Sequence, residues 1–126
     1  MLKFIKHIIL LVFCLILGDT VYAQELKVKT GTASFYAKKF IGRKTSNGER
    51  FSQDSLTCAH KTLKFGTILK VTNLKNDSVV YVRVNDRLPP KSRRIIDLSY
   101  KAAKKLNFVK AGLTKVSLEV VKTANN

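Results

Sequence analysis

Three carboxylates of the chain occupy positions where they could take part in acid–base chemistry. Glu49 follows the loop segment Thr45-Ser46-Asn47-Gly48, Asp86 ends an apolar strand-like run, and Asp97 follows Ile95-Ile96. The chain has eight acidic residues against 24 Lys and Arg, so most carboxylates are expected to be ionised and paired. An acid beside a second acid in a partly dry cleft would instead have a raised pKa and could donate a proton. Spacing alone leaves both roles open for Asp86.

A histidine and a cysteine lie close together in the segment CAHKTLKFG. A lone histidine such as His60 is more often a structural hydrogen-bonding residue than a base, and the pattern leaves both roles open. Cys58 has small and apolar neighbours, which indicates a buried, space-filling thiol rather than a nucleophile. The chain has no closely spaced pair of cysteines and no closely spaced pair of histidines, so we expect no metal and no cofactor.

Short strand patterns must position these residues. Alternation of β-branched and polar residues predicts strands over 32–37, 67–73 and 78–84, with a turn at 75–77, and a last strand carrying Val116, Leu118 and Val120 on one face. One helix is predicted over Ser99–Leu106, with Ser99 as its N-cap. The stretches 40–55 and 88–94 fit neither period and are expected to be loops. Many short strands with one small helix favour a compact β-barrel.

The first 23 residues have the pattern of an export signal. A basic start is followed by the apolar run Ile8–Leu17 and the cleavage pattern Val21-Tyr22-Ala23, which predicts a mature chain from Gln24. A membrane anchor is the rival interpretation, but spanning a bilayer takes about 20 apolar residues. A lipoprotein signal at Cys14 is a weaker alternative, because Phe13 stands where a small residue is needed. We therefore expect a single domain over 24–126, exported to the periplasm or cell envelope.

The charge of the chain indicates polyanionic partners. Loss of residues 1–23 would leave 22 basic and seven acidic residues, a formal charge of +15. Such a surplus attracts a protein to polyanions, although part of it could serve solubility alone. The export signal argues against nucleic acid and favours anionic envelope polymers or peptidoglycan as partners. We expect the protein to act as a monomer.

Five ordered segments resemble the RlpA (rare lipoprotein A) family. They run through residues 31–121 and comprise GTASFY (31–36), GRKTSNGE (42–49), AHKTLKFGT (59–67), VRVNDR (82–87) and RIIDLS (94–99), followed by the alanines of the predicted helix. The resemblance implies a mainly β fold, a six-stranded double-psi β-barrel with one or two short helices. It also implies an endolytic lytic transglycosylase that cleaves MurNAc–GlcNAc glycan strands, preferentially peptide-poor ones, and forms 1,6-anhydro-MurNAc.

The resemblance places the reaction on particular side chains. The implied catalytic residues are Asp86 as the acid–base, Glu49 as the acid that raises its pKa or stabilises positive charge, and His60. The implied substrate-binding residues are Asn85, Arg87, Tyr36 and Asn47. An expansin-like module that binds glycan without cutting it is the alternative, with Phe35, Tyr36, Phe40 and Phe51 as possible sugar-stacking faces. The chain departs from the family at Leu88, where glycine commonly follows the NDR segment, and this could reshape the adjacent loop.

Overall fold

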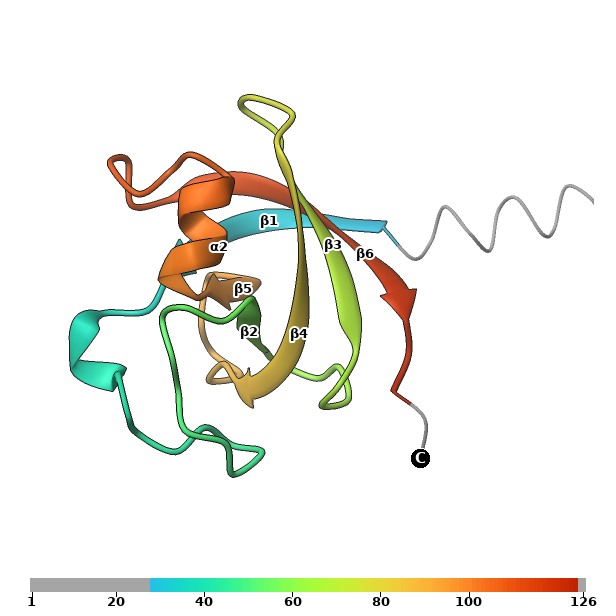
Figure 1. The fold of residues 1–126 in the computed structure, drawn as a ribbon. Helices are drawn as coiled ribbons and strands as arrows, with labels where there is room; N and C mark the ends of the chain where they lie inside the picture. The colour runs from blue at the N-terminus through green and yellow to red at the C-terminus, as the bar shows by residue number, and fades with distance from the viewer. Residues whose placement is uncertain (1–27, 125–126) are drawn as a thin grey trace, which may run out of the picture.

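The computed structural model describes residues 28–124, which form a closed barrel of six strands in the order β1-β5-β2-β4-β3-β6 (Figure 1). Closure leaves no free sheet edge for another chain to pair with. Within residues 28–124, one α-helix and one 3-10 helix accompany the barrel, so the predicted fold class is confirmed. The elements are β1 (Val28–Phe35), η1 (Lys38–Phe40), β2 (Thr57–His60), β3 (Ile68–Asn73), β4 (Val79–Arg87), β5 (Ile96–Leu98), α2 (Tyr100–Lys105) and β6 (Thr114–Lys122).

Two parallel strand pairs form one side of the barrel. The short strand β5 runs parallel to β1, the short strand β2 runs parallel to β4, and β2 and β5 pair with each other antiparallel. The long strands β3, β4 and β6 pair antiparallel, and β6 closes the barrel against β1. The parallel pairs bring four strands that are distant in sequence side by side around residues 34, 59, 86 and 97.

The core follows from the alternation of the strand residues. Val80, Val82 and Val84 alternate along the predicted strand 78–84, and in β4 they point inward and are almost completely buried. Val116 and Leu118 of β6 are likewise buried, whereas Val120 is only partly buried against the same core. Each fully buried side chain of this size contributes roughly 1.5–3 kcal/mol relative to an exposed one. The opposite residues of the strands face outward and are free to build a site.

The predicted helix forms as α2 and packs on the barrel beside β1 and β4. The hydroxyl of Ser99 accepts a hydrogen bond from the N–H of Ala102 at 3.3 Å, which confirms the predicted N-cap. Ala102, Ala103 and Leu106 are buried. Because Ser99 directly follows β5, the cap also fixes where that short strand ends.

The strand boundaries and the shortest elements differ from the predictions. The first strand covers 28–35 rather than 32–37, and β4 extends to Arg87 rather than ending at 84. Neither β2 nor β5 was predicted from periodicity, because runs of four and three residues are too short to display alternation. The predicted export signal and Cys14 lie outside the described residues. Within 28–124, no helix has the length and apolar character needed to cross a bilayer.

Candidate active site

Asp86 lies at a β-bulge near the end of β4. Cys58 of β2 pairs with Val84, but the next residue, Ala59, pairs with Asp86, so Asn85 is an extra residue in the strand. A bulge of this kind interrupts the alternation and re-aims the side chains that follow it. As a result Asn85 and Asp86 enter two adjoining polar networks outside the barrel core.

The Asp86 carboxylate accepts hydrogen bonds from three residues. Tyr36 donates its hydroxyl to Oδ2. The backbone N–H and the hydroxyl of Ser46 donate to Oδ1 at 2.9 Å and 2.7 Å, and the N–H of Arg87 donates to the same atom at 2.9 Å. The side chain is therefore fixed in position by groups from the residue after β1, from the loop before β2 and from β4 itself.

These hydrogen bonds also determine the charge of Asp86. Burial alone would raise the pKa of the half-buried Asp86 carboxyl, but the bonds from Tyr36, Ser46 and Arg87 stabilise the ionised form and hold the pKa below its ordinary value. Of the two roles that spacing left open for Asp86, the structure therefore shows the ionised, hydrogen-bonded one. Burial and the neighbouring Asp86 raise the pKa of Tyr36, so its hydroxyl remains a donor.

Tyr36 is held from three sides. Its ring stacks on Phe51 with centroids 4.2 Å apart, and the ring of Phe40 meets it edge-on at 5.8 Å. The side-chain amide of Gln53 donates to the Tyr36 carbonyl at 3.1 Å and accepts from the N–H of Tyr100 at 2.7 Å. Phe51 is buried, so among the predicted sugar-stacking residues it serves to support Tyr36.

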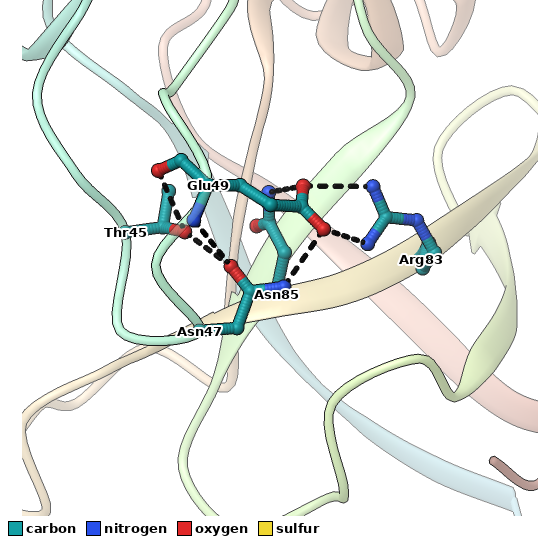
Figure 2. A network of polar contacts seen from close by, with 5 residues as sticks. All are labelled: Thr45, Asn47, Glu49, Arg83 and Asn85. Carbon is teal, nitrogen blue, oxygen red and sulfur yellow. Dashed lines mark hydrogen bonds and ion pairs between the residues drawn. The ribbon is translucent and has the colours of Figure 1, made fainter. Parts of the chain in front are cut away.

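Glu49 belongs to a neighbouring network on the outer face of β4 (Figure 2). Its carboxylate receives two bonds from the Arg83 guanidinium, at 2.6 Å and 2.9 Å. The side-chain amides of Asn47 and Asn85 donate to the same carboxylate at 2.8 Å and 3.2 Å. Three of the predicted site residues, Asn47, Glu49 and Asn85, therefore meet, and Arg83 joins them.

The charge of Arg83 keeps Glu49 ionised. Its hydrogen bonds lower the pKa of Glu49 from the ordinary 4.5 to about 2, despite an opposing effect of burial. Hydrogen bonds from Tyr36, Ser46 and Arg87 hold the pKa of Asp86 below its ordinary value, and Glu49 is not among the groups that shift it. Of the two roles considered for Glu49, raising that pKa therefore finds no support, and stabilising positive charge stays a prediction.

A tight turn brings the two networks together. The N–H of Gly48 donates to the Thr45 carbonyl at 2.9 Å, and Gly48 has φ +92°, a conformation that favours glycine. Within this turn Ser46 binds Asp86, while the backbone N–H of Asn47 donates to the Asn85 carbonyl at 3.2 Å. One loop thus holds both the bulge and the Asp86 carboxylate.

His60 lies at the end of β2 and caps the next turn. Its Nδ1 accepts from the N–H groups of Thr62 and Leu63, each at 3.1 Å. Burial and the nearby cations Arg87 and Lys29 lower the pKa of His60, so the ring is neutral at pH 7. The side chain lines a separate cavity of about 310 Å³ with Lys29 and Leu118, so its catalytic role stays a prediction.

Arg87 ties the end of β4 to the loop after β2. Its guanidinium lies over the ring of Phe65, 4.0 Å from the centroid, and donates to the His60 carbonyl at 3.4 Å. The N–H of Leu88 also donates to the His60 carbonyl, at 3.4 Å. These contacts give Arg87 a positioning role, beside the substrate-binding role that was predicted for it.

The Asp86 side chain lines a cleft of about 470 Å³ on the outer surface of the barrel. Leu88 and Pro89 form part of its wall, so the residue that departs from the family pattern faces the candidate site. The cleft is lined by residues from β1 and the segment after it, from β2, from the end of β4 and from β5: Ser34, Phe35, Tyr36, Ala37, Phe40, Ala59, Asp86, Arg87, Leu88, Pro89, Arg94 and Asp97. Within residues 28–124, no group of three His, Cys, Asp or Glu side chains could hold a metal ion.

A family model described as lytic transglycolase matches residues 28–118. The chain belongs to the lytic transglycolase family. It is 50% identical over 107 residues to "Endolytic peptidoglycan transglycosylase RlpA" of Campylobacter jejuni, covering 82% of this chain and 39% of the relative. It is 52% identical over 93 residues to the protein of that name from Vibrio cholerae, covering 74% and 35%. The resemblance to RlpA is confirmed, although the chain spans only about a third of these relatives.

Solved structures support the fold of this lytic transglycolase family member. A Streptomyces papain inhibitor superposes with a TM-score of 0.62 at 22% identity, covering 75% of this chain and 94% of the inhibitor. An expansin from Clavibacter michiganensis gives 0.59 at 22% identity, covering 79% and 52%. At such identities the likeness concerns the double-psi β-barrel alone.

The predictions missed several groups of the site. Ser46 was part of a quoted segment, but only the fold reveals that it donates two hydrogen bonds to Asp86. Arg94 and Asp97 form an ion pair in the cleft, with Nε 2.9 Å from Oδ1. Asp97 was singled out as an unusual carboxylate without a role. Its place between Ile96 and Leu98, both buried in β5, could have indicated an outward-facing position.

Proposed function

We propose that this lytic transglycolase family member is an endolytic peptidoglycan lytic transglycosylase that cleaves MurNAc–GlcNAc strands and forms 1,6-anhydro-MurNAc. The observation that carries the proposal is the Asp86 carboxylate, held in fixed orientation in an open cleft. The relatives named as endolytic peptidoglycan transglycosylases support the substrate and the reaction. Asp86 is the catalytic acid–base.

Asp86 must gain a proton before it can act as an acid. A sugar that fills the cleft removes water from the carboxylate, and desolvation favours the neutral form. Protonated Asp86 donates to the glycosidic oxygen, the C1–O bond breaks, and positive charge develops on the MurNAc ring. Asp86 then takes the proton of the C6 hydroxyl as O6 bonds to C1. The proton is returned to Asp86, and no water is consumed.

The remaining predicted residues position this carboxylate or the sugar. Tyr36 orients Oδ2 through its hydroxyl and lines the cleft. The Glu49 carboxylate accepts hydrogen bonds from the side-chain amides of Asn47 and Asn85. It thereby holds the turn that contains Ser46. His60 and Arg87 brace the end of β2 and the end of β4.

The same proposal sets the location and the partners. Peptidoglycan lies outside the cytoplasm, so the protein is exported and works in the periplasm or cell envelope. It acts as a monomer on glycan strands, with preference for peptide-poor ones. Its basic surface holds anionic envelope polymers rather than nucleic acid.

Purified protein incubated with amidase-treated sacculi tests the reaction, with mass spectrometry of the released material. We expect anhydro-MurNAc ends from the wild type and a loss of about 10²–10⁴-fold in rate for Asp86→Asn. Asp54→Asn, which removes an exposed carboxylate outside the cleft, is the matched control and should retain activity. Strong pull-down by sacculi without anhydro products would instead identify an expansin-like binding module.

A further inference from the structure

A row of four residues crosses the barrel surface beneath the cleft. Asp86 of β4 pairs with Ala59 of β2, Ala59 also pairs with Asp97 of β5, and Asp97 pairs with Ser34 of β1. Directly paired residues of neighbouring strands point to the same face of a sheet. All four residues line the cleft, in agreement with this geometry.

The row places two carboxylates on opposite sides of a small side chain. Neighbouring strands lie about 4.8 Å apart, so the backbones at Asp86 and Asp97 are separated by roughly 10 Å. Ala59 between them carries only a methyl group and forms the floor. Enzymes that cleave glycosidic bonds through two carboxylates place one on each side of the scissile bond. A sugar lying over Ala59 would have Asp86 on one side and Asp97 on the other.

Asp97 is held in place as firmly as Asp86. The hydroxyl of Ser34 donates to its Oδ1. Arg94 places Nε 2.9 Å from the same oxygen and donates from Nη2 to Oδ2 at 3.2 Å. The Nε contact is an ion pair without hydrogen-bond alignment, which leaves this buried N–H unsatisfied. The negative charge of Asp97 also contributes to the raised pKa of Tyr36, which places Asp97 within electrostatic reach of the hydroxyl that binds Asp86.

Glu49 cannot fill this position. Its carboxylate is occupied by two bonds from Arg83 and by the amides of Asn47 and Asn85, and Glu49 does not line the cleft. Asp97 lines the cleft directly, and its side chain is only 18% exposed. Of the two carboxylates, Asp97 is the one a bound sugar would meet.

We propose that Asp97 is a second catalytic carboxylate, which faces the reacting sugar across Ala59 from Asp86 and stabilises the positive charge that develops on its ring. This role rests on the proposed transglycosylase activity, and Asp97 transfers no proton in it. Asp86 carries out both proton transfers, and Asp97 remains the anion. A fixed charge aimed at a developing charge contributes on the order of 10²–10³-fold in kcat once the bound sugar has displaced water from the site.

Asp97→Asn tests the role, because asparagine keeps the shape and the acceptor for Ser34 but removes the charge. We expect kcat to fall roughly 10²–10³-fold, with KM and sacculus pull-down within about threefold of wild type. Asp77→Asn makes the same charge change in an exposed turn and should leave kcat unaltered. An Asp97→Asn protein with wild-type kcat overturns the role of Asp97 alone. A wild-type protein that forms no anhydro product overturns the proposed function and this role together.

Arg94→Gln separates electrostatics from packing, since it breaks the ion pair but leaves the Asp97 charge in place. If Asp97 served only to anchor Arg94, both variants would lower kcat and the thermal midpoint equally. We expect Arg94→Gln to lower the midpoint comparably while retaining at least tenfold more kcat than Asp97→Asn. Should Asp97→Asn fail to fold, Asp97→Glu keeps the charge but displaces it. A loss of at least tenfold in kcat is then expected, and unchanged kcat contradicts the role.

Discussion

The Asp86 carboxylate receives more hydrogen bonds than orientation alone requires. Four donor groups from three residues favour its ionised form, yet the first step of the proposed reaction needs its proton. Burial raises the pKa of Asp86, against the effect of these donors, and this contribution would grow as a sugar displaces water from the cleft. Asp86 would therefore take up a proton from solvent as the substrate binds, and after donating it the carboxylate can act as the base of the second step.

Tyr36→Phe removes one donor from Asp86 and keeps the ring stacked on Phe51. Because the lost hydrogen bond stabilised the ionised form, the pKa of Asp86 should rise toward its ordinary value. A carbon-13 NMR titration of the carboxyl groups measures this shift. We expect kcat to fall by roughly ten- to a hundredfold, since the carboxylate loses the contact that orients it.

Tyr81→Phe is the control for this change, because Tyr81 lies exposed on β4. It should leave the Asp86 titration and kcat as in the wild type. An Asp86 pKa that stays constant or falls in Tyr36→Phe would contradict the hydrogen-bond assignment.

At the scale of elements, the segment between η1 and β2 is clamped onto β4 by charge. Glu49 at the end of the tight turn binds Arg83, and Asn47 beside it binds the bulge residue Asn85. The clamp fixes the turn that delivers Ser46 to Asp86. Loss of the Glu49 charge should therefore loosen the Asp86 carboxylate without unfolding the barrel.

The pKa of Glu49 predicts an acid limit to this clamp. The folded protein lowers that pKa from 4.5 to about 2, so the ionised pair stabilises the fold above pH 4.5. This contribution is lost as the pH falls from 4.5 toward 2. Both side chains are more than one-third exposed, so the effect is modest, under about 1 kcal/mol. Thermal midpoints measured across this range should fall more steeply for the wild type than for Glu49→Gln.

Glu119→Gln removes an exposed carboxylate of β6 and should retain the wild-type slope between pH 2 and 4.5. Equal slopes for the wild type and Glu49→Gln would show that the Arg83 pair adds nothing to stability.

The Gln53 side chain connects the loop before β2 to the residue after β1 and to the start of α2. Its removal should therefore lower both the stability of the fold and the rate of the reaction. Gln53→Ala removes the bonds to the Tyr36 carbonyl and the Tyr100 N–H, which together stabilise the fold by about 1–3 kcal/mol. Calorimetry measures the lower midpoint, and the anhydro-product assay should show reduced kcat because Tyr36 is released. Ser55→Ala in the same exposed loop should change neither quantity.

The sequence predicts the long elements better than the contacts between them. Val80, Val82 and Val84 alternate clearly enough to predict β4, and Ser99 marks the start of α2. Periodicity cannot reveal β2 or β5, and it cannot place an extra residue at Asn85, because a bulge depends on the partner strand. The resemblance supplied Asp86, but pairing of β1, β2, β4 and β5 was needed to bring Asp97 beside it.

At the scale of the whole molecule, closure of the barrel brings the residues of the candidate site together. The positive charge of the protein is expected to promote substrate binding. Two parallel strand pairs gather Ser34, Ala59, Asp86 and Asp97 from distant parts of the chain onto one outer face. The full chain carries a formal charge of +16, and Arg94 and Arg87 line the cleft itself. Glycan strands freed of peptides expose a carboxylate on each MurNAc, so long-range attraction should assist binding.

Salt should therefore weaken substrate binding without altering the chemical step. Screening lengths shorten from about 10 Å at 0.1 M salt to about 3 Å at 1 M, so pull-down by amidase-treated sacculi should fall over this range. The rate at saturating substrate should change little, because the proposed roles of Asp86 and Asp97 operate at contact distance. Two double variants test where the attraction arises. One removes Lys91 and Arg93, two exposed residues of the loop beside the cleft (Lys91→Gln with Arg93→Gln), and the other removes Lys70 and Lys75 on the β3–β4 hairpin (Lys70→Gln with Lys75→Gln). The first should reduce the salt dependence of pull-down more than the second. An equal reduction in salt dependence for the two double variants would mean that the total charge of the protein, rather than the charges beside the cleft, attracts the glycan strand.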